Sequence, residues 1–114
     1  MTLSSSILNK RESSNPFITP IVTQEIADRV TNATIEFISK VSKIPGVKKI
    51  AYKPKGNVIT IWTFINKPDK DIQFSVYEIE QQIMEKYPEL IFDFTIIFKG
   101  KKSPTGFYEQ VISK

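Results

Sequence analysis

Five lysines are the residues of this sequence best suited to binding an anion. They lie in two short segments, with Lys53 and Lys55 in one and Lys99, Lys101 and Lys102 in the other. If the fold brings the segments together, their ammonium groups are candidate contacts for nucleic-acid phosphates. A solvated run of lysines needs no ligand, and this simpler interpretation is favoured because the 12 acidic residues are interspersed with the 16 basic ones.

Trp62 and Phe64 form a second candidate site. They are two residues apart in an apolar segment, which places them on one face of a strand. Aromatic side chains on an open sheet face can stack with single-stranded bases. The chain has no aromatic and glycine-rich motif like that of four-stranded RNA-binding sheets. We therefore favour packing of this pair against a second copy of the chain or against the C-terminal residues.

Asp93 is a third candidate, because carboxylates are depleted in strands. It could form an acid site with Glu78 or Glu80, but a solvent-facing position on an edge strand, where a charge discourages edge pairing, is favoured. The sequence contains no histidine and no cysteine. This excludes histidine-based triads, His–metal centres and cysteine nucleophiles. We expect no enzymatic activity, no cofactor and no metal site.

The segment Val58–Ile65 must position these residues, since it is apolar, aromatic or β-branched throughout and predicts the central strand of a sheet. Its alternate residues define two apolar faces, one with Ile59, Ile61 and Ile65 and the other with Val58, Trp62 and Phe64. Amphipathic helices can cover the first face. The second face is left without a clear partner in the rest of the chain.

Two helices are predicted from apolar residues spaced three and four apart. The first begins at Pro20, with Thr19 as its N-cap, and ends near Ile44, before Pro45-Gly46. The second is capped by Asp69 or Asp71 and ends near Tyr87, because Pro88 stops it.

The remaining strands complete the predicted fold. Residues 47–53 form a hairpin with the central strand across the turn 53–57, and residues 90–98 return parallel to it after a helical crossover. Residues 107–112 add a helical turn or a strand, and both alternatives stay open. The predicted architecture is an α-β-β-α-β ferredoxin-like two-layer α+β sandwich, with a three-stranded sheet and two helices on one face. We expect a disordered tail over 1–15 and a single domain over 16–114.

Part of this pattern resembles the cytoplasmic C-terminal domain of cation diffusion facilitator transporters. The similar features are Pro45-Gly46-Val47 before a strand, Gly56 in the hairpin, and Ser75-Val76-Tyr77-Glu78-Ile79 with Ile83 in the second helix. In that family the domain dimerises and binds metal through histidines and acids. The resemblance implies the shape and the tendency to pair, but no metal ligands, because this chain has no histidine.

The uncovered face gives the functional expectation. An exposed patch formed by Val58, Trp62, Phe64, Ile91 and Ile97 would be larger than soluble monomers usually tolerate. We therefore expect a non-enzymatic adaptor or regulatory module, favoured as a homodimer that pairs through this face, with another protein as a further candidate partner. The alternative is a small nucleic-acid-binding protein that uses the same face and the lysine loops. A cytoplasmic location without membrane contact is expected, because the apolar runs are strand-sized and no signal sequence opens the chain.

Overall fold

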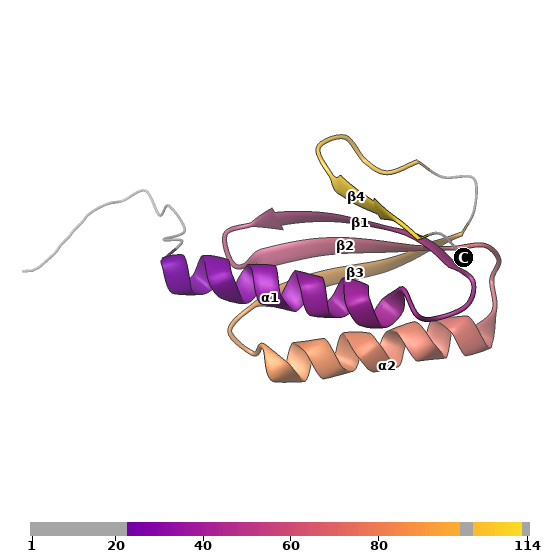
Figure 1. Ribbon diagram of the computed structural model, residues 1–114, viewed down its shortest axis with the longest axis horizontal. Coiled ribbons are helices and arrows are strands. Elements are labelled where there is room, and N and C mark those ends of the chain that lie inside the picture. Colours follow the sequence, from indigo (N-terminus) through magenta and orange to yellow (C-terminus); the bar gives the residue numbers. More distant parts are fainter. Residues whose placement is uncertain (1–22, 99–101, 113–114) are drawn as a thin grey trace, which may run out of the picture.

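The protein is an α+β structure of two layers. The computed structural model describes residues 23–98 and 102–112. Helices α1 (Gln24–Val41) and α2 (Lys70–Lys86) lie on one face of a sheet (Figure 1). The sheet contains β1 (Val47–Lys55), β2 (Val58–Ile65), β3 (Ile91–Phe98) and β4 (Tyr108–Val111). The prediction of two helices covering one face is confirmed.

The strands lie in the order β3-β2-β1-β4. β1 is antiparallel to β2 and β4, and β3 is parallel to its neighbour β2. The predicted hairpin and parallel third strand are confirmed, but the predicted three strands and ferredoxin-like order are not matched. In a split β-α-β unit another strand separates the parallel pair, whereas here β3 adjoins β2 directly. The fourth strand is the C-terminal segment left open by the sequence, and it pairs with the backbone groups along the outer edge of β1.

Local capping sets the ends of α1. The Thr23 hydroxyl oxygen accepts a hydrogen bond from the Ile26 N–H at 3.1 Å, which makes Thr23 the N-cap. At the other end the backbone N–H of Ser42 and its hydroxyl both donate to the Ile38 carbonyl. The helix therefore ends at Val41, before the predicted Ile44. Thr19, Pro20 and the predicted tail 1–15 lie outside the described residues.

The cap of α2 is Asp69, one of the two predicted alternatives. Its Oδ1 accepts hydrogen bonds from the N–H groups of Asp71 at 2.9 Å and Ile72 at 3.1 Å. Gly46 precedes β1 with a φ of 97°. A Cβ at that position would collide with the Ile72 Cδ1 atom, so the glycine lets the start of β1 approach α2 closely.

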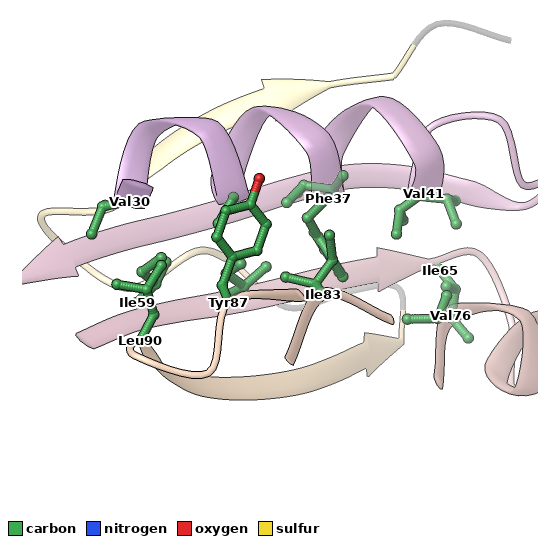
Figure 2. Close-up of a cluster of buried hydrophobic side chains, with 13 residues drawn as sticks. Val30, Phe37, Val41, Ile59, Ile65, Val76, Ile83, Tyr87 and Leu90 are labelled. Carbon is green, nitrogen blue, oxygen red and sulfur yellow. The ribbon is translucent and has the colours of Figure 1, made fainter. Parts of the chain in front are cut away.

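The core lies between the helices and the sheet (Figure 2). Phe37 of α1 and Val76 and Ile83 of α2 are 0 % exposed. They pack with Ile59, Ile61 and Ile65, the face of the central strand that the sequence predicted to be covered by helices, and with Val47 and Ile50 of β1. From β3, Phe92, Phe94 and Ile96 contact this core, but Phe98 is 42 % exposed. Phe98 shares this face, beside Ile65 in the strand register, but lies at the end of the strand where the cover is incomplete.

Candidate functional site

The sheet face turned away from the helices, here called the open face, carries the predicted interface residues. The strand register places Val58 beside Ile91 and Phe64 beside Ile97, with Trp62 between them on β2. All five side chains share this face because alternate residues of a strand point the same way. Their exposure differs. Ile91 is 56 % exposed and Phe64 only 5 %, while the other three are half-buried.

Other parts of the chain cover part of this face. The Phe107 ring lies 5.9 Å from the ring of Trp62, measured between centroids, and the Lys49 ammonium lies 4.4 Å from the centroid of Phe64. The sequence left two kinds of cover for Trp62 and Phe64, a second copy of the chain or the C-terminal residues. Phe107 supplies cover of the second kind, because the loop before β4 turns at Gly106, where φ is 89°, and brings the ring onto the sheet.

A hollow of about 520 Å³ opens on this face beside Phe107. The residues lining it come from β1, β2, the turn between them and the loop before β4, and they are Lys53, Lys55, Asn57, Val58, Thr60 and Phe107. In the strand register Lys53 pairs with Thr60 and Lys55 with Val58. Two of the five predicted phosphate contacts therefore share one site. Lys102 is exposed in the loop, and Lys99 and Lys101 lie outside the described residues.

The cations of the open face are not equivalent. The Lys49 ammonium pairs with the Glu109 carboxylate of β4 at 3.2 Å. The Ser103 hydroxyl, and after it Lys49, hold the pKa of Glu109 below its usual value. Among the described residues, neither Lys53 nor Lys55 forms an ion pair of this kind. The hollow therefore presents two ammonium groups without a carboxylate in its lining.

The acid site weighed for Asp93 does not form. Asp93 is exposed on the open face beside Thr60, whereas Glu78 and Glu80 belong to α2 on the other face. Glu80 is 8 % exposed, and burial raises its pKa to about 7. In the described part of the chain, no three acidic side chains converge in a way that could hold a metal ion.

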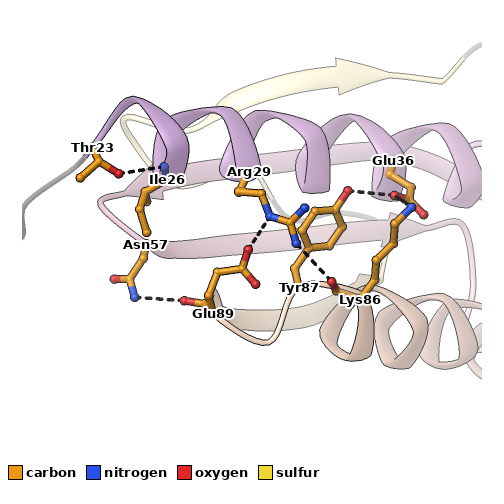
Figure 3. A network of polar contacts seen from close by, with 8 residues as sticks. All are labelled: Thr23, Ile26, Arg29, Glu36, Asn57, Lys86, Tyr87 and Glu89. Atoms are coloured by element: carbon orange, nitrogen blue, oxygen red, sulfur yellow. Dashed lines mark hydrogen bonds and ion pairs between the residues drawn. The ribbon is translucent and has the colours of Figure 1, made fainter.

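A cluster of charges joins α1 to the C-terminal end of α2 (Figure 3). Glu36 of α1 accepts hydrogen bonds from the Lys86 ammonium at 2.9 Å and from the Tyr87 hydroxyl at 3.0 Å. Lys86 and the other donors lower the pKa of Glu36 to about 2. Arg29 pairs with Glu89 and lies over the Tyr87 ring, 4.6 Å from its centroid. Because each charge already has a partner, we interpret this cluster as a clamp between the helices.

Sequence patterns alone do not predict this cluster. The partners of Glu36 are 50 and 51 residues away along the chain, so no local spacing pattern connects them to it. Phe107 was considered as a final packing residue, but its place beside the lysines depends on the turn at Gly106. The sequence identified the lysines and Phe107 as separate candidates, but it did not predict that they line the same hollow.

A second apolar surface lies around β3, which is an edge strand in the described sheet. Its members, here called the β3 flank, are Ile91 and Phe98 of β3 and Tyr77 and Met84 of α2, all between 40 % and 56 % exposed. Gln82, on α2, contacts α1 through Lys40. Tyr77 and Met84, seven residues apart, lie on the opposite side of α2. The sequence signal was available, because Tyr77 and Met84 are apolar but do not share the helix face of Val76 and Ile83.

Comparison with protein-family models, curated proteins and solved structures finds no significant match for this chain. The resemblance to the transporter domain therefore stays a prediction. In the described ranges, neither helix is both long and apolar enough to span a membrane.

Proposed function

We propose that this protein is a non-enzymatic interaction module that self-associates, and that β3 forms the centre of the interface. The supporting observation is that none of the other described strands pairs with the outer edge of β3, which carries exposed apolar side chains beside it. The β3 flank includes Ile91 at 56 % exposure and Tyr77 at 48 %. Ile91 and Ile97, from the interface predicted for the open face, belong to this strand. The centre of the open face is less available, because Phe107 and Lys49 cover Trp62 and Phe64.

The backbone of β3 is suited to pairing with another strand. The Ile91 N–H donates to the Asn57 carbonyl at 2.9 Å, so Ile91 and alternate residues after it bond to β2. Phe92, Phe94 and Ile96 therefore direct their N–H and C=O groups to the outer edge. No other described strand pairs with that edge. Natural proteins rarely leave a long apolar edge strand unprotected.

A second copy of the same strand is the partner we propose. In a twofold antiparallel pair centred at Phe94, Asp93 lies opposite Thr95 of the other copy. In one centred at Thr95, Asp93 lies opposite Ile97. In each register the Asp93 carboxylates of the two copies are not opposite each other. The Asp93 charge, which was expected to discourage edge pairing, is therefore compatible with the pairing of two β3 strands. Twofold dimers are also the commonest homo-oligomers.

The test is the mass in solution of two matched double variants. Ile91→Lys with Phe98→Lys places charges at both ends of β3, and Val111→Lys with Tyr108→Lys places them on β4. All four residues are exposed on edge strands, with exposures of 56 %, 42 %, 67 % and 62 % in that order. Burying unpaired ammonium groups costs on the order of several kcal/mol, which weakens a dimer more than a hundredfold.

Sedimentation should show a dimer for the wild type and for the β4 variant, and a folded monomer for the β3 variant. Circular dichroism checks that each variant is folded. The dimer should persist from about 0.05 to 0.5 M salt, because apolar contacts and backbone hydrogen bonds are weakly screened. A monomeric wild type, or a β3 variant that stays dimeric while folded, contradicts the proposal. Loss of the dimer in Trp62→Glu alone, with the β3 variant still dimeric, would return the interface to the open face.

A further inference from the structure

The hollow on the open face places cations beside an aromatic ring. Lys53 and Lys55 lie two residues apart on β1, so both side chains emerge on the same face. Opposite them on β2 are Thr60, which offers a hydroxyl, and Val58, which offers an apolar wall. Phe107 closes the hollow from the loop side. The lining therefore contains groups for an anion, for a flat apolar ring and for hydrogen bonding.

The loop holds Phe107 in a defined place. The Phe107 N–H donates to the Pro104 carbonyl at 3.4 Å, which closes a turn around Gly106. The Lys53 Nζ atom lies 3.7 Å from the point that a Cβ on Gly106 would occupy. The ammonium group therefore sits against the same turn that presents the ring. The Phe107 ring also contacts Trp62, and this contact supports it from the sheet side.

The charges around the hollow favour an anionic ligand. Lys49, on the same face of β1, is compensated by Glu109, but Lys53 and Lys55 have no such partner among the described residues. The lining contains no acidic residue. The Asp93 carboxylate lies one strand further out, on the far side of Thr60. Two neighbouring ammonium groups repel each other, and a bound phosphate would relieve this repulsion.

We propose that this hollow binds single-stranded nucleic acid, with one base against the Phe107 ring and the neighbouring phosphate at Lys53 and Lys55. A volume of about 520 Å³ is in the range of sites for one small group. Base faces are accessible in single strands and hidden in duplexes, which favours the single strand. The hollow is open to solvent, so a longer strand can enter and leave it. This inference does not depend on the proposed self-association.

The experiment uses a fluorescein-labelled oligo(dT) of about 10 nucleotides and the full chain, with anisotropy measured at several salt concentrations. With two phosphates engaged, the logarithm of affinity should fall with the logarithm of salt at a slope of about −1.4. Affinity should then drop roughly sevenfold between about 0.05 and 0.2 M salt. Trp62, the single tryptophan, contacts Phe107, and its fluorescence should change on binding.

Two variants separate the parts of the site. Lys53→Gln with Lys55→Gln should weaken binding and bring the salt slope close to zero. Phe107→Leu should weaken binding about tenfold and leave the slope unchanged, because it removes stacking and no charge. The matched control is Lys43→Gln with Lys70→Gln, which changes the net charge equally at exposed positions outside the sheet. Its affinity should equal that of the wild type.

Three results would overturn the proposal. The first is a wild type that does not bind the oligonucleotide at the lowest salt. The second is an equal loss of affinity in the control double variant, which would mean unspecific attraction by net charge. The third is competition by adenosine monophosphate as effective as that by unlabelled oligonucleotide at equal nucleotide concentration, which would assign the hollow to a free nucleotide. Circular dichroism of each variant verifies that the fold is intact.

Discussion

Replacing Glu80 by glutamine should stabilise the protein at alkaline pH and leave its stability nearly unchanged in acid. Glu80 is 8 % exposed on α2, and burial raises the pKa of its carboxyl group to about 7 from the ordinary 4.5. Below pH 4.5 both the folded and the unfolded chain hold the proton, so the shift has no effect. As the pH rises from 4.5 to about 7, the unfolded chain loses the proton first, and the free energy of unfolding falls.

The size of the effect follows from the shift. One pKa unit is about 1.4 kcal/mol, so a rise from 4.5 to about 7 lowers the free energy of unfolding by about 3 kcal/mol once the pH exceeds 7. A glutamine amide has the shape of the protonated acid and cannot ionise. Glu80→Gln should therefore gain about 3 kcal/mol at pH of about 8.5, equivalent to roughly 10 °C or more in Tm, and almost nothing at pH of about 4.

Urea unfolding followed by circular dichroism at these two pH values measures the difference. Glu78→Gln is the matched control, because Glu78 is exposed on the same helix and should change stability little at either pH. Ionisation of Glu36 does not affect the comparison between the wild type and Glu80→Gln. Its pKa of about 2 removes stability as the pH falls from 4.5 toward 2, and this loss is the same in both proteins. An equal effect of Glu80→Gln at both pH values, or a loss of stability at pH of about 8.5, would refute the reasoning.

Two further substitutions test the packing. Gly46→Ala should destabilise the fold by about 1 to 3 kcal/mol in chemical denaturation, because φ is 97° and the new Cβ collides with Ile72. Gly106→Ala should destabilise it less. Its φ is similar, but the new Cβ would lie 3.7 Å from the Lys53 Nζ atom. Equal losses would show that φ strain alone matters. Thr63→Val should stabilise by about 1 kcal/mol in the same assay, because the Thr63 hydroxyl is buried and has no hydrogen-bond partner among the described residues. A loss of stability would mean that the hydroxyl is satisfied in solution.

Sequence patterns predicted those helices, strands and caps that depend on residues close together in the chain. The two apolar faces of Val58–Ile65 indicated a central strand, and the acid at Asp69 indicated a cap, since each depends on neighbouring residues. β4 could not be assigned in this way. All four of its residues are exposed, so it has no buried alternation, and its pairing with β1 joins residues about 60 positions apart. The order of the sheet depends on such distant contacts.

Single residues of the candidate site could be predicted as well, because residue type and strand periodicity are local features. Lys53 and Lys55 were found by residue type, and strand periodicity placed Trp62 and Phe64 on one face. Cover of that face by the C-terminal residues stayed one of two alternatives, because it depends on one turn at Gly106 that brings Phe107 back over the sheet. Because Phe107 and Lys49 cover the centre of the open face, the proposed interface is placed at β3. Phe64 is only 5 % exposed, whereas Ile91 and Phe98 of β3 are 56 % and 42 % exposed.

The two proposed surfaces are compatible in one assembly. β3 is at one edge of the sheet, whereas the hollow is formed by β1, β2 and the loop before β4. An antiparallel pair of β3 strands continues the sheet, and its twofold axis runs perpendicular to the sheet. The two open faces then point the same way, so both hollows are turned to the same side of an eight-stranded sheet. Pairing through the centre of the open face would instead bury the hollows between the copies. Edge pairing is therefore the mode of self-association that leaves the lysines and Phe107 free to bind a strand.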